Sequence, residues 1–389
     1  MYHRLRVGLL VVFCLSIGNL FGLFAQHSTD YYSLSMVGNA GNGIFAPYYL
    51  SANKHGLVTH SKSGYLRASV FKGLEMNKRF SYEFGIDLVG LMSSTSPVSY
   101  YSDGNLKTYN PGVSSFLIQQ AYIGMKYRMI FISAGCRELT DEVVNFELSS
   151  GGLVWSGNAR PIPQVRAGFI DFVDIPFTKG WVQIKGELAY GKFMDNDFLR
   201  DHYNYYNQYI TTDALYHHKS ISFRSNPDKP FVVTIGAELA AQFGGTKRYY
   251  KEGVLIDSLT MKSPTRLKDF FKILFPSSGD GQTNEGDQAY YYGNHVGQWN
   301  LSAEYRFKDN SSVRGYFEWY YDDASGMGKF NGWDGLWGLE YKSGKKNWLS
   351  NVVLEYLDMT NQSGPLNWCP SDYNDPKLDK KHKTTVEKW

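Results

Sequence analysis

The residues best suited to chemistry are two adjacent histidines, His217 and His218, which are followed by Lys219 and Ser220. In a strand, adjacent side chains point to opposite faces, so only one of the two histidines can face a given side. His218 and Ser220 would then share a face, and a serine beside a histidine is the minimal pair for nucleophilic catalysis. The sequence offers no third group to orient the histidine, and the same alternation prevents the two histidines from binding one metal ion. We therefore expect neither a catalytic residue nor a metal site. A lipid- or glycan-modifying barrel enzyme that uses His218 remains one alternative.

The segment that holds these histidines is one of thirteen in which apolar and polar side chains alternate. In residues 231–243, for example, Ile235 and Leu239 share one face, whereas Thr234 and Glu238 lie on the other. The stronger segments have about 9 to 13 residues, the length that a tilted strand needs to span a membrane. The predicted strands are residues 31–37, 65–73, 81–92, 115–127, 129–137, 163–171, 181–192, 215–224, 231–243, 298–307, 312–322, 334–343 and 347–358.

The connections between these segments alternate between short and long. A soluble β-sandwich also has strands with one polar and one apolar face, but nothing requires its connections to keep that parity. Outer-membrane barrels have short periplasmic turns and long extracellular loops. The sequence therefore predicts an all-β protein, a transmembrane antiparallel β-barrel. The predicted long loops are residues 38–64, 93–114, 138–162, 193–214, 244–297 and 323–333.

The composition agrees with this fold class. Aromatic residues make up 16% of the 389 residues, and Tyr and Trp are suited to the interface between lipid and water. The formal net charge of +3 gives no reason to expect a nucleic-acid partner. The mean hydropathy of −0.37 excludes a bundle of membrane-spanning helices. Outer-membrane lipid is the expected partner, and the sequence does not indicate an oligomeric state. Because no glycine-rich phosphate loop joins a strand to a helix, we also expect no cofactor.

The two ends of the chain differ from this pattern. Residues 1–25 have a basic start and an apolar run, and they end in a small residue, Ala25, which predicts a cleaved signal peptide. Residues 26–358 then form the barrel, and residues 359–389 form a polar tail that is disordered or aberrant. Thirteen strands is an odd number, whereas bacterial single-chain barrels have an even number. Either one strand has been miscounted or the chain is a truncated or frame-altered gene product, and we favour truncation.

The polar faces of the predicted strands should line the lumen. Their charged side chains are of both signs, and such side chains tend to pair across neighbouring strands. This mixture favours a narrow or filled barrel over a wide porin whose lumen carries charges of one sign. The expected lumen residues are Arg67, Glu83, Asp87, Lys185, Glu187, Arg224, Glu238, Glu304, Arg306, Arg314 and Glu318.

One short helix is predicted in the longest loop. Ser263 can cap it, Pro264 suits its first turn, and Pro276 ends it. Four apolar residues at helical spacing would form one stripe that packs on neighbouring loops or in the barrel mouth. These residues are Leu267, Phe270, Phe271 and Leu274.

Several motifs occur in the order seen in a known family. The chain resembles the Wzi-type capsule assembly proteins of Bacteroides-like bacteria, and the likeness covers most of residues 30–365. The resemblance implies an eighteen-stranded outer-membrane barrel with a largely blocked lumen and no catalytic residues. It also implies a role in attaching capsular polysaccharide at the cell surface. The motifs are residues 46–57 (APYYLSANKHGL), 147–153 (ELSSGGL), 156–163 (SGNARPIP), 215–220 (LYHHKS) and 293–295 (GNH).

The sequence thus predicts a non-catalytic outer-membrane protein that binds or organises capsular polysaccharide through its outer loops. Aromatic platforms combined with polar side chains are the residue types we expect to contact sugar. A porin or solute channel is the second alternative, beside the barrel enzyme. The candidate carbohydrate-binding residues are Tyr48, Tyr49, Trp155, Asn158, Arg160, Tyr291 and Tyr292.

Overall fold

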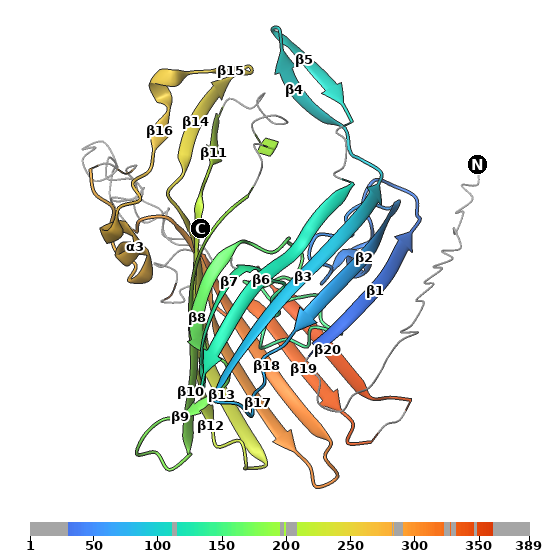
Figure 1. Cartoon of the computed structure of the whole chain (residues 1–389), viewed down its shortest axis with the longest axis vertical. Coiled ribbons are helices and arrows are strands. Elements are labelled where there is room, and N and C mark those ends of the chain that lie inside the picture. Colours follow the sequence, from blue (N-terminus) through green and yellow to red (C-terminus); the bar gives the residue numbers. More distant parts are fainter. Residues whose placement is uncertain are drawn as a thin grey trace.

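The protein is an all-β structure built on one curled antiparallel sheet, seen in a computed structural model (Figure 1). The structure describes residues 30–110, 115–194, 198–199, 208–281, 283, 291–322, 327, 332–345 and 348–360. The predicted signal peptide and most of the predicted tail lie outside these residues.

Thirteen long strands follow one another round the sheet in chain order, and each pairs antiparallel with the next. They coincide with the thirteen predicted segments, which confirms the predicted fold class. A short strand, β9 (Val173–Asp174), also pairs with β10 and brings the sheet to fourteen strands. The long strands are β1 (Asp30–Asn39), β2 (Ser63–Lys72), β3 (Phe80–Ser93), β6 (Phe116–Tyr127), β7 (Ile130–Cys136), β8 (Gln164–Phe169), β10 (Val182–Lys192), β12 (Leu215–Ser225), β13 (Phe231–Phe243), β17 (Asn294–Arg306), β18 (Ser312–Asp322), β19 (Gly335–Lys342) and β20 (Asn351–Asp358).

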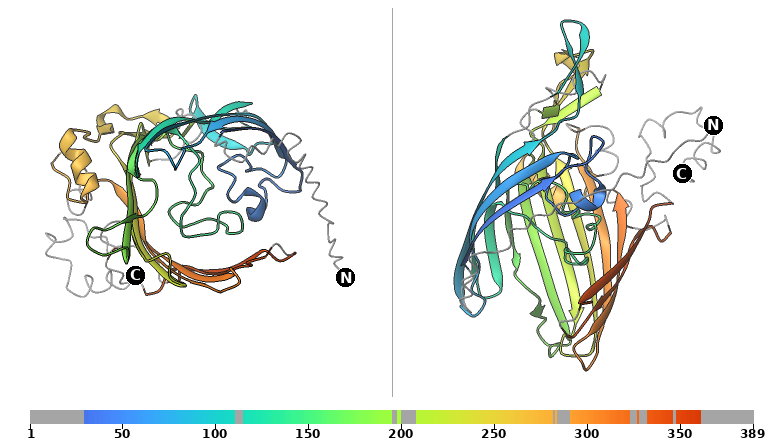
Figure 2. Two further views of the ribbon diagram at one scale, coloured as in Figure 1. Left: turned by 60° about the horizontal axis from the view of Figure 1, so that its bottom comes forward. Right: turned by 90° about the vertical axis from the view of Figure 1, so that its right-hand side faces the viewer.

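The sheet curls into a barrel wall that is open along one seam (Figure 2). Within the described part of the chain, β1 and β20 are the two edges and do not pair with each other. Because the sheet has thirteen antiparallel strands when both edges are counted, the two edge strands run in the same direction.

The two faces of the wall differ in polarity as the alternation requires. On the outer face, Ile235 of β13 is 55% exposed and Leu301 of β17 is 46% exposed. On the inner face of the same strands, Glu238 and Gln298 are buried. An apolar surface of this kind is stable against lipid, while the polar residues pair inside. No described helix is long and apolar enough to cross a membrane.

The long connections carry small elements that the sequence analysis missed. A hairpin of β4 (Val98–Ser102) and β5 (Asn105–Tyr109) projects beyond the wall (Figure 1). A separate small sheet lies beside it on the same end of the molecule. It contains β11 (Gln208–Thr212), β14 (Thr246–Lys251), β15 (Val254–Leu255) and β16 (Met261–Lys262), with the 3-10 turn η1 (Asp257–Leu259).

Two helices lie in the described loops. The first, α1 (Tyr48–Ser51), was not predicted; it is a single turn between β1 and β2 and lies inside the curve of the sheet (Figure 2). The predicted helix is present as α3 (Leu267–Leu274). The residue before its first turn is Arg266 rather than Ser263, and the Asp269 carboxylate accepts hydrogen bonds from the backbone N–H and the guanidinium of Arg266.

The face of α3 that packs is also different from the predicted stripe. Leu267 is 76% exposed and Phe271 is 56% exposed, whereas Ile273 is fully buried. The helix lies against the outer side of the wall, where Ile273 and Phe270 pack on Phe243 of β13. The predicted packing face was wrong because the helix packs on the outer face of the barrel wall and not in the mouth of the barrel.

Candidate functional site

The interior of the barrel is filled by one long loop. Residues 137–163, between β7 and β8, turn inward and run inside the curve of the sheet (Figure 2). We call this segment the lumen loop. It carries two of the motifs on which the family resemblance rests.

Hydrogen bonds tie the lumen loop to inward side chains of the opposite wall. Asn145 Nδ2 donates to Glu340 Oε1 of β19 at 2.6 Å. The backbone N–H of Leu153 donates to Glu318 Oε2 of β18 at 2.8 Å. The N–H of Val154 donates to Gln298 Oε1 of β17 at 3.2 Å. Since Glu318 and Gln298 are completely buried, breaking these bonds would leave polar groups unpaired in the interior.

The loop between β1 and β2 holds the lumen loop from the other side. Asn53 Nδ2 donates to the carbonyls of Phe146 at 3.1 Å and Ser149 at 2.6 Å. The N–H of His55 donates to the Gly157 carbonyl at 2.8 Å, and the His55 ring stacks on Phe146 with centroids 5.5 Å apart. The motifs at residues 46–57 and 147–163 therefore meet in space, about 100 residues apart in sequence.

Trp155 connects the lumen loop to His218. The indole Nε1–H of Trp155 lies 3.1 Å from His218 Nε2. The same nitrogen lies 3.1 Å from Glu238 Oε2, and His218 Nδ1 lies 3.4 Å from Glu187 Oε1. His218 faces the lumen as the alternation requires, but its ring nitrogens contact the lumen loop and two wall carboxylates. This arrangement fits a structural tie better than a general base for Ser220.

A pair of buried carboxyl groups lies where the lumen loop meets β18. Asp141 Oδ1 accepts bonds from the N–H groups of Val143 at 2.6 Å and Val144 at 3.2 Å. Its other oxygen faces the Glu318 carboxyl, and the two side chains share a hydrogen bond. Because two carboxylates cannot donate to each other, this bond requires one proton. Burial, together with the negative charge of Glu238, raises the pKa of Asp141 to about 7.

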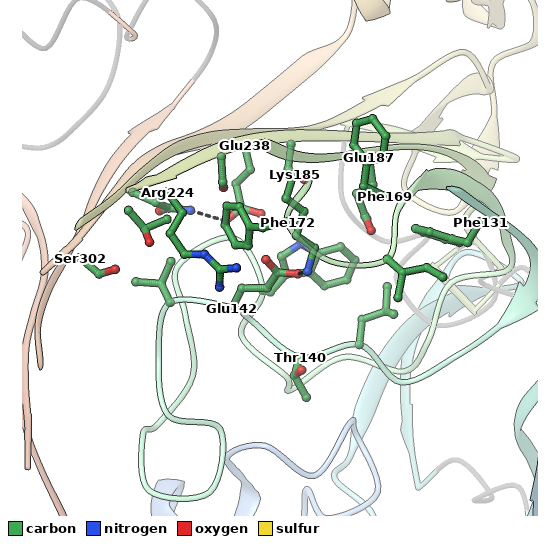
Figure 3. A pocket seen from close by; sticks show the side chains of 18 of the residues that line it. Phe131, Thr140, Glu142, Phe169, Phe172, Lys185, Glu187, Arg224, Glu238 and Ser302 are labelled. Carbon is green, nitrogen blue, oxygen red and sulfur yellow. Dashed lines mark hydrogen bonds and ion pairs between the residues drawn. The ribbon is translucent and has the colours of Figure 1, made fainter. Parts of the chain in front are cut away.

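The lumen loop separates two cavities. The cavity at the short-turn end has a volume of about 650 Å³ (Figure 3). The cavity at the long-loop end has a volume of about 280 Å³. Both volumes lie at or near the range of ligand sites, and the two cavities meet at four shared residues. These residues are Arg137, Glu138, Leu139 and Trp155.

All the charged residues predicted to face the lumen lie on the inner face of the wall. Arg67 contacts Asp87 and donates to Glu138 at 2.7 Å. Arg314 Nη2 lies 2.6 Å from Glu340. Glu318 and Glu238 bind the lumen loop as described above. The others line the larger cavity: Glu83, Lys185, Glu187, Arg224, Glu304 and Arg306.

The seven candidate carbohydrate-binding residues do not form one group. Tyr48 and Asn158 lie together, with Asn158 Nδ2 donating to Tyr48 Oη at 3.4 Å. Tyr49 is exposed next to them in α1. Trp155 and Arg160 both line the smaller cavity.

Two candidates lie elsewhere. Tyr292 is 1% exposed and packs under α3 on the outside of the wall, where its hydroxyl donates to the Pro264 carbonyl. Its expected place on an exposed loop is therefore wrong. Tyr291 precedes it and lines neither cavity.

Sequence reasoning missed the wall residues of the smaller cavity. Gln164 of β8 is 6% exposed, and its Oε1 accepts no hydrogen bond from the described residues. Tyr216 of β12 and Asn294 of β17 line the same space. The alternation of inward and outward side chains along each strand could have indicated that these residues face the lumen. Only the strand register shows that they lie close together. Among the described residues, no group of three or more His, Cys, Asp or Glu could hold a metal ion.

Comparisons with known proteins add little to this geometry. No protein-family model and no curated protein sequence matches the chain. Solved structures of mutants of the porin from Rhodopseudomonas blastica are similar in outline. One mutant has 11% identity and a TM-score of 0.30, covering 84% of this chain and 98% of the porin. A triple mutant has 12% identity and a TM-score of 0.28, with the same coverage. Likenesses this remote carry no argument here, and the fold class rests on the strand pairing of the chain itself.

Proposed function

We propose that this protein is a non-catalytic outer-membrane β-barrel that binds capsular or other surface polysaccharide, in the manner of the Wzi-type family that its motifs resemble. The outward apolar side chains and the continuous hydrogen-bond ladders from β1 to β20 suit a lipid environment. The alternation of short and long connections supports an orientation in which the hairpin β4–β5 and the small sheet lie outside the cell.

The observation that carries the proposal is the anchored lumen loop. A solute channel needs a continuous aqueous path, whereas here the middle of the lumen is occupied by a loop tied to β17, β18 and β19. Each tie ends on a buried wall side chain, so displacing the loop is costly. An occupied barrel that displays long loops fits binding better than transport.

The smaller cavity is the binding site that the geometry favours. Trp155, Tyr216 and Phe193 supply aromatic surface, and Arg160 supplies a cation. Gln164 offers a buried amide oxygen that no described group satisfies, so a sugar hydroxyl is a suitable donor to it. The cavity lies at the long-loop end, which faces the cell surface in the proposed orientation.

The proposal is tested by capsule retention in cells. Deleting the gene should release capsule into the medium without stopping capsule synthesis, and the wild-type gene should restore retention. Gln164→Leu, which keeps the side-chain volume but removes the amide, should fail to restore it. Ser133→Ala is the matched control because Ser133 is a buried inner-face residue that lines neither cavity. Unchanged retention in the deletion strain would count decisively against the proposal.

Two experiments separate this function from its alternatives. The purified protein in planar bilayers should show no steady conductance; a stable open level would favour a channel. His218→Ala should leave the lipid and glycan composition of the membrane unchanged. An altered composition would favour the barrel enzyme.

A further inference from the structure

The larger cavity contains one arginine that the protein does not neutralise. Four other arginines line this cavity, and each lies beside a carboxylate. The partners are Glu83 for Arg137, Glu187 for Arg166, Glu304 for Arg306 and Glu340 for Arg314. Arg224 of β12 is different: among the described residues, no carboxylate lies within ion-pair distance of its guanidinium.

Neutral groups instead hold Arg224 in place. Its Nε and Nη2 donate to Gln183 Oε1 at 3.0 and 2.8 Å, respectively. Its guanidinium carbon lies 4.1 Å from the centroid of the Phe172 ring, so the ring face stabilises the charge. Figure 3 shows Arg224 and Phe172 extending into the same open space. The side chain is therefore ordered before any ligand arrives, which lowers the entropic cost of binding.

The free edge of this guanidinium has the geometry of a carboxylate receptor. Gln183 occupies the edge formed by Nε and Nη2, which leaves the edge formed by Nη1 and the second N–H of Nη2. Two parallel N–H groups on such an edge match the two oxygens of a carboxylate.

Hydroxyl-bearing residues lie in the same register row of the wall as Arg224. The strand register pairs Gln183 with Arg224, Arg224 with Thr234 and Thr234 with Ser302, so these side chains form one row across β10, β12, β13 and β17. Ser222 also lines this part of the cavity. Hydroxyls both donate and accept hydrogen bonds, as the hydroxyls of a sugar do.

We propose that Arg224 and this hydroxyl row form a second binding site, for a sugar that carries a carboxylate. The carboxylate binds the free edge of Arg224, and the ring hydroxyls bind Thr234, Ser302 and Ser222. The site lies at the short-turn end of the lumen, on the opposite side of the lumen loop from the smaller cavity. It does not depend on the proposed function, because its geometry is independent of what the outer loops bind.

The test is isothermal titration of the purified full chain in detergent with D-glucuronate and with D-glucose, which differ at C6: glucuronate has a carboxylate where glucose has a hydroxymethyl group. Glucuronate should bind roughly ten- to a hundred-fold more tightly, the factor expected for charge-assisted hydrogen bonds. Arg224→Gln should reduce the affinity for glucuronate to that for glucose. Arg224→Lys keeps the charge but loses the paired N–H edge, so it should weaken binding about five- to ten-fold and guards against misfolding of the glutamine variant.

Three controls can overturn the assignment. Arg306→Gln removes a paired arginine of the same cavity and should change the affinity less than three-fold; an equal loss would mean that only the overall charge matters. Acetate should bind at least ten-fold more weakly than glucuronate, and equal binding would rule out sugar recognition. Tighter binding of glucose 6-phosphate than of glucuronate would show a phosphate site instead. Failure of this titration leaves capsule retention untouched, so the two proposals can be judged separately.

Discussion

Asp141→Asn offers the sharpest test of how the lumen loop is held. In the wild-type protein, burial and the negative charge of Glu238 raise the pKa of Asp141 from the ordinary value of 3.8 to about 7, although the hydrogen bond with Glu318 acts in the opposite direction. An amide at this position keeps the acceptor for Val143 and Val144 and offers a permanent donor to Glu318. The substitution should therefore hold the loop without needing a proton.

The sign and size of the effect follow from the raised pKa. The folded protein binds the Asp141 proton more tightly than the unfolded chain does. The free energy that this tighter proton binding adds to loop docking is fully present below about pH 4. It falls as the pH rises to about 7 and is absent above that. The difference between 3.8 and about 7 corresponds to a free energy on the order of 4 kcal/mol at 1.4 kcal/mol per tenfold change. The variant should lose this dependence and hold the loop more tightly than wild type at pH 8.

Hydrogen exchange of the Val143, Val144 and Leu153 amides measures loop opening directly. After correction for the intrinsic rates, the wild-type opening free energy should be lower at pH 8 than at pH 5, and that of Asp141→Asn should be nearly constant. Glu147→Gln is the matched control, because it removes a carboxylate from an exposed side chain of the same loop. Equal wild-type opening free energies at both pH values, or a variant that keeps the wild-type slope, would refute the raised pKa of Asp141.

Three further predictions concern the wall and the partition between the cavities. Ile235→Arg places a charge on the outer face and should lower the unfolding free energy in lipid by about 2–4 kcal/mol. Thr234→Arg places the charge in the larger cavity and should lower it by less than half as much. Equal losses of unfolding free energy would contradict the assigned faces. Arg67→Gln leaves the carboxylate of Asp87 buried without its ion pair and should lower the unfolding free energy by about 3–5 kcal/mol, measured by thermal unfolding in detergent. A loss below about 1 kcal/mol would show that this ion pair does not stabilise the fold. Trp155→Ala removes one of the four side chains that line both cavities and should produce conductance steps in planar bilayers where the wild type is silent; continued silence would mean that other loop residues close the path.

The wall strands were predictable because lipid and lumen impose a strict alternation on every one of them. The same rule failed at strand ends, where the outer face is covered by protein instead of lipid. For this reason β17 begins at Asn294, four residues before the predicted start, with His295 of its outer face buried. The loop strands β4, β5, β11 and β14 were missed because no membrane imposes a pattern on them.

The candidate site was only partly predictable. Strand parity correctly indicated which charged residues face inward, because it depends only on local spacing. It could not indicate that Asn53 binds the backbone near Ser149, or that Asn145 reaches Glu340, since these contacts join residues 96 and 195 positions apart. Arg224 was named as one lumen charge among many, and only the coordinates distinguish it from its neutralised neighbours.

The length of the connections made by the lumen loop has a consequence for biogenesis. The Asn145 side chain is bound to Glu340 and the Ser150 N–H to Glu355, across separations of 195 and 205 residues. Contacts over such distances form late, because the chain between them must first be ordered. The interior can therefore be sealed only after the strands of the second half have been inserted, which makes a sealed interior a sign of completed assembly.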